Sequence, residues 1–249
     1  MTSSPPSSID PDEVARFSAQ AREWWNPHGP FRPLHKFNPV RLGYIRDQIG
    51  AHFGRAGQNP LPFRGLRMLD IGCGGGLVCE PMARLGAQIT GVDASAENIA
   101  AAHAHALAQG LGVDYRHGSA EALVEEEDRF DVILNLEVIE HAADQNLFLA
   151  ACAQLLKPGG LMVMASLNRT LKSYALAILG AEYLLQWLPR GTHDWNKFIS
   201  PDELAAKLEG LGLRVVARTG VSYRILNDRW VLSADQEVNY MLSAAKSPA

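Results

Sequence analysis

Short apolar runs and longer stretches with helical spacing alternate along the middle of the chain, from Leu66 to Leu167. This alternation is typical of an α/β fold, in which a mostly parallel sheet has helices packed on both faces. The strands predicted from these runs are LRMLDI, QITGVD, VDYRHG, FDVILNL and LMVMASL, followed later in the chain by LRVVART and EVNYML. Ser95 and Ser200 stand where side chains that cap helix starts are expected.

The N-terminal part has a different pattern. The segment PDEVARFSAQAREWW has helical spacing and begins with a proline suited to a first helical turn. Residues 26–39, rich in proline and aromatic residues, are expected to form an ordered irregular loop before a second helix from about Pro39 to Phe53. We therefore expect a disordered tail over residues 1–10, a helical cap over 11–60 and the main domain over 61–249.

Composition narrows the class of protein. The chain has 249 residues, of which 47% are hydrophobic and 20% charged, as in a soluble globular protein with a full core. A net charge of −4 without a dense basic run argues against nucleic acid as a partner. Cys73, Cys79 and Cys152 lack paired spacing, and the N-terminus resembles no export or organelle signal, so we expect reduced thiols in a cytoplasmic chain.

A glycine-rich turn follows the first predicted strand. Gly72, Gly74 and Gly76 come directly after it, in a spacing that places backbone N–H groups close to a ligand. Leu77 occupies the position of the third glycine of the dinucleotide pattern, which weakens a nicotinamide interpretation. Asp93 ends the next strand, where a carboxylate can accept hydrogen bonds from ribose hydroxyls. A nucleoside ligand is therefore expected.

Three ionisable residues follow the fourth predicted strand. Glu137, Glu140 and His141 stand at its carboxyl end, and they share a face if the turn is helical. They fit a divalent cation site, a general base centred on His141, or a polar rim without chemistry. His141 is an awkward ligand for Mg²⁺, which prefers oxygen. The residues alone leave these alternatives open.

The strings LDIGCGGG and GVD resemble those of the class I S-adenosylmethionine-dependent methyltransferases, over about Leu66 to Leu167. The resemblance implies a Rossmann-like, mostly parallel seven-stranded sheet that binds this cofactor at the carboxyl ends of its first strands. It also implies that Asp70 helps to hold the methionine portion of the cofactor or the loop itself, and that Gly72, Gly74 and Gly76 belong to the binding loop.

Longer strings narrow the resemblance. PLHKFNPVRLGYI, LEVIEH, SLNRT, LGAEYLLQWLPRGTHDWNKFISPDEL and VNYML resemble the ubiquinone-biosynthesis O-methyltransferases, over about Trp24 to Leu242. That family methylates catechol-type polyprenyl intermediates, namely 2-polyprenyl-6-hydroxyphenol and 3-demethylubiquinol. By position, the resemblance implies that Arg41 meets the cofactor carboxylate, Asp93 its ribose and Leu136 the adenosine. In eukaryotic relatives the pattern of Glu137, Glu140 and His141 is associated with a divalent cation, which makes Mg²⁺ a candidate here.

Methylation of a phenol needs the oxygen to lose its proton. A phenol with a pKa near ~10 is mostly protonated at neutral pH. A cation bound to both catechol oxygens or His141 acting as a base would each assist, and both routes use the same triplet. The competing functions are methylation of another small molecule and a non-catalytic scaffold that binds S-adenosylmethionine.

A polyprenyl acceptor resides in a membrane, so the apolar insertion over residues 168–198 is a candidate for contact with lipid. Its stretch from Tyr174 to Leu188 contains Glu182 as its only charged residue and is too short to span a bilayer. We expect peripheral contact with the inner face of the membrane through residues 170–190, or equally a lid helix packed on the core. The residues expected to make the membrane contact are Leu176, Leu179, Leu184 and Trp187. Other enzymes of ubiquinone biosynthesis are further candidate partners.

Overall fold

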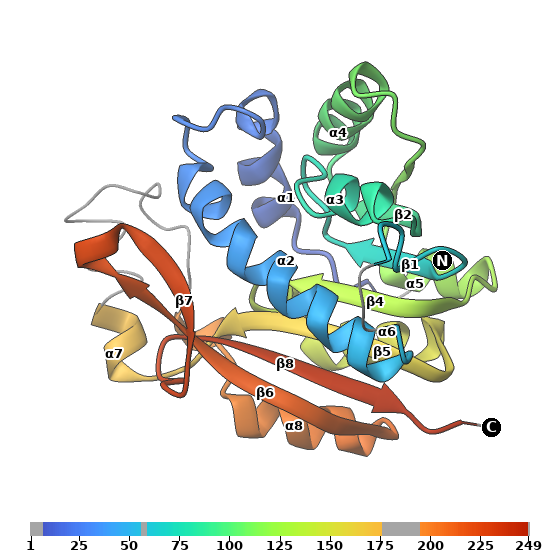
Figure 1. Cartoon of the computed structure of the whole chain (residues 1–249). Helices are drawn as coiled ribbons and strands as arrows, with labels where there is room; N and C mark the ends of the chain where they lie inside the picture. Colours follow the sequence, from blue (N-terminus) through green and yellow to red (C-terminus); the bar gives the residue numbers. More distant parts are fainter. Residues whose placement is uncertain (1–6, 56–58, 176–194, 249) are drawn as a thin grey trace, which may run out of the picture.

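The computed structural model describes residues 7–55, 59–175 and 195–248. These residues form one sheet of eight strands in the order β3-β2-β1-β4-β5-β8-β6-β7, with helices on both faces (Figure 1). The strands are β1 (Arg67–Ile71), β2 (Gln88–Asp93), β3 (Asp114–His117), β4 (Phe130–Leu136), β5 (Leu156–Leu167), β6 (Leu213–Arg224), β7 (Arg229–Ser233) and β8 (Asn239–Lys246).

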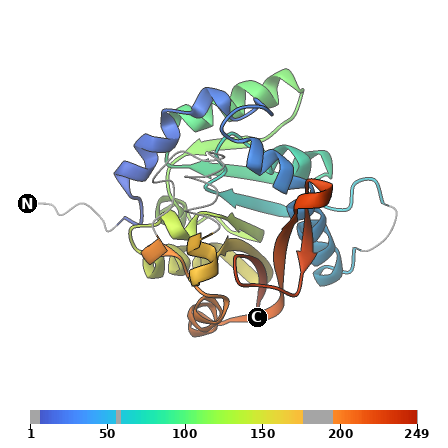
Figure 2. The same ribbon diagram turned by 90° about the vertical axis from the view of Figure 1, so that its left-hand side faces the viewer.

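The first five strands pair in parallel, and β8 inserts antiparallel between β5 and β6. The predicted α/β class with a mostly parallel sheet is confirmed. The structure adds one strand to the seven expected, because β6 continues beyond Thr219 to Arg224 and turns back as β7. Figure 2 shows α1 and this β6–β7 hairpin on opposite sides, with the strands of the sheet between them.

The helices are α1 (Pro11–Ser18), α2 (Arg32–His52), α3 (Cys79–Arg84), α4 (Ala96–Ala108), α5 (Ala120–Glu125), α6 (Gln145–Leu155), α7 (Leu171–Ser173) and α8 (Pro201–Gly210). Short 3-10 turns add η1 (Ala21–Glu23), η2 (Ile139–His141), η4 (Trp195–Lys197) and η5 (Ile225–Asn227). The predicted starts of α4 and α8 are confirmed, because the hydroxyls of Ser95 and Ser200 accept hydrogen bonds from the backbone N–H groups of Asn98 and Glu203.

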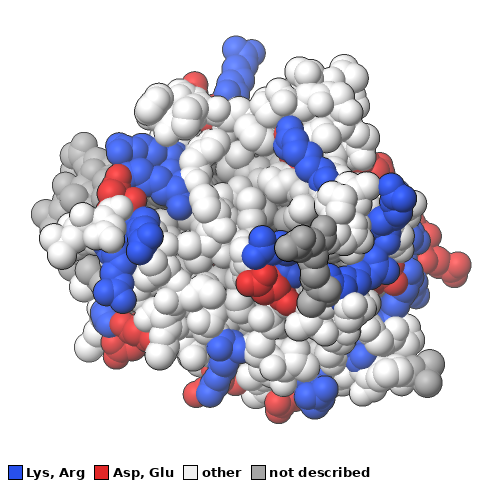
Figure 3. All heavy atoms as spheres, viewed as in Figure 1, with Lys and Arg blue, Asp and Glu red and all other residues white. Residues whose placement is uncertain are grey.

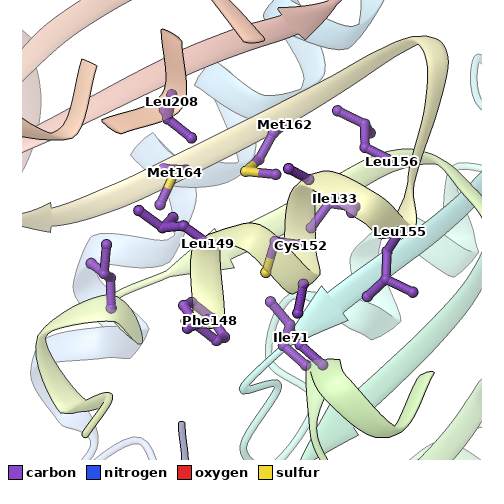
Figure 4. Close-up of a cluster of buried hydrophobic side chains, with 14 of the residues drawn as sticks. Ile71, Ile133, Phe148, Leu149, Cys152, Leu155, Leu156, Met162, Met164 and Leu208 are labelled. Carbon is purple, nitrogen blue, oxygen red and sulfur yellow. The ribbon is translucent and has the colours of Figure 1, made fainter. Parts of the chain in front are cut away.

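Two apolar cores lie on the two faces of the sheet. Helices α5, α6 and α8 cover one face, where Leu149 and Leu208 pack with Ile133 and Met162 of the central strands (Figure 4). Helices α2 and α3 cover the other face, where Ile45 belongs to the second core. The core on both faces fixes the register of the central strands, and with it the positions of the residues at their carboxyl ends.

Helix α2 begins at Arg32, seven residues before the predicted start at Pro39, so residues 32–38 are helical rather than an irregular loop. Pro33 is accommodated in the first turn, where a missing N–H costs nothing, whereas Pro39 lies inside the helix. The face that carries Phe37 and Tyr44 is buried, and this burial offsets the hydrogen bond that Pro39 cannot donate.

Two further expectations concern the N-terminal tail and the apolar insertion. Residues 7–10, expected within a disordered tail, contact the domain: the Ser8 backbone N–H donates to Glu121 Oε1, and the Ser8 carbonyl accepts from the N–H of Ala143. The four residues expected to touch a membrane, Leu176, Leu179, Leu184 and Trp187, lie outside the described residues. No helix within the described ranges is long and apolar enough to cross a membrane.

Charged side chains on the face shown in Figure 3 lie in separate groups, and many basic residues stand beside acidic ones. One ion pair joins Lys36 of α2 to Asp228 of the β6–β7 hairpin, with the Lys36 Nζ atom 2.6 Å from the Asp228 carboxylate. Such surface pairs contribute little to stability, but this one joins the N-terminal part to the C-terminal hairpin.

Candidate active site

A cavity of about 850 Å³ lies at the carboxyl ends of β1, β2 and β4. Its walls come from α1 and α2, the glycine-rich turn, the turn after β4 and the β6–β7 hairpin. Open parallel sheets place their ligands at this edge, and the volume is typical of a small-molecule site. Of the ten residues predicted as site residues, eight line the cavity, while Gly76 and Glu140 do not: the eight are Arg41, Asp70, Gly72, Gly74, Asp93, Leu136, Glu137 and His141.

The glycine-rich turn leaves no room for side chains. Gly72 and Gly74 have φ angles of +71° and +52°, which disfavour residues with a Cβ atom. A Cβ on Gly72 would lie 2.4 Å from a methyl carbon of Val138, and one on Gly74 would lie 2.4 Å from the Trp24 ring. Gly76 packs against Tyr115 instead of the cavity, so its predicted role in cofactor binding has no contact to support it.

Asp93, at the end of β2, fixes this turn. Its Oδ2 atom accepts a 2.8 Å hydrogen bond from the backbone N–H of Gly74. Its Oδ1 atom accepts from the Ser95 N–H at 2.9 Å and from Asn98 Nδ2 at 3.1 Å. A carboxylate has about four acceptor positions, so the three internal bonds leave capacity for about one ribose hydroxyl rather than two. Burial raises the pKa of Asp93 above its ordinary value despite these donors.

Asp70 and Arg41 are both buried beside the glycine-rich turn. Burial raises the pKa of Asp70 to about 7, although the thiol of Cys79 donates to its carboxylate and the charge of Arg41 opposes the rise. Arg41 comes from α2, where its Nη2 atom donates to Asn38 Oδ1 at 3.0 Å and its Nη1 atom lies 3.6 Å from Glu137 Oε2. The Arg41 Nε atom is buried and has no hydrogen-bond acceptor among the described residues. A buried guanidinium with an unused donor fits a carboxylate ligand.

The three residues after β4 diverge. Glu137 has a φ of +58° and turns its carboxylate toward Arg41 at the cavity wall. His141 lies in η2, with Nδ1 2.9 Å from Glu13 Oε2 of α1. Glu140 points into the core, where it accepts a 2.9 Å hydrogen bond from Ser166 Oγ. Burial, and next the charge of Glu137, raise the pKa of Glu140 to about 8.

This divergence removes the support for a cation site at the triplet. No group of three His, Cys, Asp or Glu side chains suited to a metal ion occurs in the part of the chain that the structure describes. The left-handed backbone of Glu137 and the short 3-10 turn after it prevent the shared helical face that the spacing suggested. The residues present do not fit a Mg²⁺ ion at Glu137, Glu140 and His141.

Two tryptophans for which the sequence suggested no role, Trp24 and Trp25, pack on the glycine-rich turn. Trp24 packs on Gly74 and Gly75, and its Nε1 atom donates to Asn98 Oδ1 at 2.8 Å. Trp25 donates from Nε1 to the carbonyl of Gly75 at 2.9 Å. The pair of adjacent tryptophans near the N-terminus was the available signal, since two such large rings need buried partners.

Aromatic residues form the wall of the cavity between α2 and the hairpin. The Phe37 and Trp230 ring centroids are 5.0 Å apart, and those of Tyr223 and Trp230 are 5.3 Å apart. This wall contrasts with the polar end at Asp93 and Arg41. The cavity therefore has one end suited to a charged nucleoside and another suited to an apolar molecule.

Comparisons with known proteins agree with this geometry. Residues 69–164 match the family model described as "Methyltransferase domain". The fold is similar to that of a possible histamine N-methyltransferase from Thermotoga maritima, with a TM-score of 0.62 and 17% identity over 94% of this chain and 99% of that chain. It is also similar to magnesium protoporphyrin IX methyltransferase from Synechocystis PCC 6803 with bound S-adenosylhomocysteine, with a TM-score of 0.58 and 18% identity over 92% and 99% of the two chains.

Two curated relatives are much more similar in sequence, and both are named "Ubiquinone biosynthesis O-methyltransferase". The protein from Chelativorans sp. is 61% identical over 97% of this chain and 96% of its own length. The protein from Parvibaculum lavamentivorans is 60% identical over 97% of this chain and 95% of its own length. Identity at this level over nearly the whole of each chain shows that the chain belongs to the family of ubiquinone biosynthesis O-methyltransferases.

Proposed function

We propose that the chain transfers a methyl group from S-adenosylmethionine to a phenolic hydroxyl of a catechol-type polyprenyl intermediate of ubiquinone biosynthesis. The observation that carries the proposal is the two-ended cavity. Its polar end has Arg41, Asp93 and a turn without side chains, and its apolar end has an aromatic wall. One cavity can thereby hold the methyl donor and an apolar acceptor side by side. Transfer of a methyl group between two substrates requires this proximity.

The residues at the polar end fit the cofactor. When bound, S-adenosylmethionine supplies an electrophilic methyl group on its sulfonium. The unused Nε donor of Arg41 suits the carboxylate of the cofactor, and the remaining acceptor capacity of Asp93 suits a ribose hydroxyl. The turn at Gly72 and Gly74 brings backbone close to the ligand, and Leu136 adds an apolar edge. Asp70 lines the cavity beside the turn and accepts a hydrogen bond from the Cys79 thiol, which helps to keep the turn in place.

The acceptor would lie against the aromatic wall. Phe37, Tyr223 and Trp230 offer apolar surface for a ring and the start of a prenyl tail, while Glu137 and His141 line the part of the cavity next to the glycine-rich turn. Burial of apolar surface at about 25 cal/mol per Å² makes such a wall the main source of acceptor affinity.

His141 is the residue best placed to take the phenol proton. It lines the cavity, its Nδ1 atom is held by Glu13, and a histidine has a pKa near neutrality in its unperturbed state. Glu137 holds Arg41 in place. Glu140 does not reach the cavity; its hydrogen bond with Ser166 in the core anchors the turn that carries His141. No step is assigned to Mg²⁺, because the triplet does not gather around a common point.

Contact with the inner face of the membrane belongs to the same proposal. A polyprenyl acceptor partitions into lipid, so an enzyme that reaches it gains from lying at the surface. Leu171 and Tyr174, at the start of the apolar insertion, are 83% and 43% exposed and stand beside Lys172. Flotation with anionic liposomes tests the contact: we expect the whole chain to float and a chain with residues 176–188 deleted to remain in the dense fraction. Equal flotation of both would place the contact elsewhere.

The decisive experiment measures S-adenosylhomocysteine formed from S-adenosylmethionine and a short-chain prenyl catechol, without additions, with EDTA, and with EDTA followed by Mg²⁺. We expect product that is unaffected by EDTA. Activity lost in EDTA and restored by Mg²⁺ would reinstate a cation in the reaction. Binding of S-adenosylmethionine without product would favour another acceptor or the non-catalytic scaffold.

A further inference from the structure

A carboxylate from the N-terminal helix reaches into the cavity and contacts His141. Glu13 of α1 places Oε2 2.9 Å from His141 Nδ1, although 128 residues separate the two along the chain. The side chains are only 15% and 16% exposed, and both line the cavity. The Phe17 ring and the imidazole pack edge-to-face at a centroid distance of 5.2 Å. His141 is therefore held by two residues of α1.

The contact determines which ring nitrogen carries the hydrogen. An ionised carboxylate can only accept, so a hydrogen bond at this distance requires the hydrogen on Nδ1. In the neutral imidazole the lone pair then lies on Nε2, which is the nitrogen able to take a proton. The hydrogen is assigned to Nδ1 from the chemistry of its partner, a carboxylate.

Glu13 is suited to remain ionised. Burial raises the pKa of Glu13, but the hydrogen bond and charge of His141, with the charges of Arg16 and Lys197, outweigh burial and hold it below its ordinary value. Arg16 pairs with Glu13 on the same helix, and Lys197 is anchored to Asp10 with Nζ 2.7 Å from Oδ2. The acceptor for Nδ1–H is thus charged, and a charged acceptor also stabilises the imidazolium that forms after proton transfer.

We propose that Glu13 is a positioning residue that fixes His141 in the Nδ1–H tautomer, so that Nε2 receives the proton of the phenolic acceptor. The phenol oxygen gives its proton to Nε2 and uses its electron pair to bond the methyl carbon, whose bond to sulfur breaks and leaves its pair on sulfur. The imidazolium afterwards releases the proton to water. The inference rests on the proposed function, because it assigns a role within that reaction.

The first test compares two acceptors in the wild type and in Glu13→Gln. One is an ordinary prenyl catechol, and the other is a nitro-substituted catechol whose hydroxyl is already ionised at the assay pH and needs no base. We expect kcat for the ordinary catechol to fall about 10- to 100-fold, less than the roughly 100- to 10,000-fold contribution of a general base, because Glu13 positions the base and is not the base itself. The KM for S-adenosylmethionine and kcat for the nitrocatechol should change less than about twofold, since neither depends on proton removal.

Matched variants separate positioning from damage to the fold. Asp12→Asn removes a charge from the exposed side of the same helix and should retain both activities. Glu13→Asp keeps the carboxylate and should recover part of the lost kcat. An equal loss for both acceptors in Glu13→Gln, or no loss for either, would overturn the proposal. A wild type that makes no product from the ordinary catechol would instead contradict the proposed function.

The second test needs no reaction. Nitrogen NMR of the resting wild-type protein reports the tautomer of each histidine, and the His141 signal is assigned by its absence from a His141→Gln spectrum. We expect Nδ1–H at His141 in the wild type and a shift toward the other tautomer in Glu13→Gln. An Nε2–H tautomer at His141 in the wild type would overturn the proposal, even if every Glu13 variant failed to fold.

Discussion

Two turns that line the cavity, the glycine-rich turn and the turn after β4, are held in place by different kinds of contact. At the glycine-rich turn, most hydrogen bonds come from backbone groups and from Asp93, within a stretch from β1 to the start of α4, and Trp24 and Trp25 pack on this loop from the N-terminal part. At the turn after β4, the contacts come from side chains whose partners lie far away in sequence. Glu137 faces Arg41 of α2, and His141 contacts Glu13 of α1. The first turn is shaped mainly by contacts that are local in sequence, whereas the second is shaped by contacts between distant elements.

This difference determines which kind of substitution disrupts each turn. A backbone surface has no side chain to remove, so adding a Cβ atom is the change that alters it. An assembled set of side chains loses its arrangement when any one partner is changed, whichever element carries that partner. The following predictions probe the two turns and the elements that hold them, beginning with the largest expected effect.

Gly72→Ala should have the largest effect, on cofactor affinity. The left-handed φ of +71° costs an alanine about 1–2 kcal/mol, and the new Cβ would lie 2.4 Å from Val138. The turn should move to relieve this strain, and restoring its position on binding would cost up to about 3 kcal/mol, or roughly a 100-fold weaker Kd for S-adenosylmethionine. Isothermal titration measures the Kd directly.

Gly112→Ala is the control for this change. No atom lies within 4 Å of a Cβ built there, and its φ is outside the left-handed range. We expect its Kd to match that of the wild type. If Gly72→Ala also kept wild-type affinity, the turn would be able to accommodate a Cβ atom. The contrast between a turn that binds through its backbone and a turn held by side chains would then be lost.

Glu140→Gln should change how stability depends on pH. The pKa of Glu140 is raised to about 8 from an ordinary 4.5, first by burial and then by Glu137. Between these values the unfolded chain releases the proton and the folded chain retains it, so the wild type loses stability as pH rises, by up to about 1.4 kcal/mol per pH unit. Glutamine carries no such proton. The variant should therefore gain about 2–4 kcal/mol over the wild type at pH 8 and little near pH 4.5.

Urea unfolding at a series of pH values measures this difference, with the exposed Glu125→Gln as the control. The control should follow the wild-type curve. A Glu140→Gln curve parallel to that of the wild type would mean that Glu140 titrates normally, and that it is solvated rather than part of the core.

Asp10→Ala should have the smallest effect. Asp10 caps α1 by accepting from the Asp12 N–H, and it pairs with Lys197. Losing both contacts should cost about 1–2 kcal/mol of unfolding free energy. Asp10→Asn keeps the cap and should cost less than about 1 kcal/mol. Urea unfolding compares the two, and a larger loss in Asp10→Asn would mean that the ion pair, rather than the cap, holds α1 against the domain.

The parts of the fold that depend on neighbouring residues could be predicted from the sequence. Strand and helix alternation gave the sheet, and Ser95 and Ser200 marked helix starts, because a cap and its partner lie three residues apart. The turn at Gly72 followed from the same short-range logic, whereas its hydrogen bond to Asp93, which was expected to bind ribose, was not predicted. Similarity to a family then supplied Arg41, which its own surroundings in the sequence would not single out.

Features that depend on distant contacts could not be predicted. The spacing of the triplet after β4 suggested that its three side chains share one face. Instead, the left-handed Glu137 directs its carboxylate away from Glu140, and each side chain contacts a different secondary-structure element. The early start of α2 depends on burial against the sheet, and β7 exists because it pairs with the extension of β6. Spacing along a chain does not encode these partners.

The position of the N-terminal segment has a consequence for synthesis of the chain on the ribosome. Trp24 needs Asn98 and Glu13 needs His141, and these partners follow 74 and 128 residues later. At about 5–20 residues per second, the second interval lasts roughly 6–26 seconds. Helix α1 has only eight residues, fewer than an isolated helix needs to persist in water. This segment is therefore made well before it becomes ordered, and until then Trp24 and Trp25 are available to chaperones.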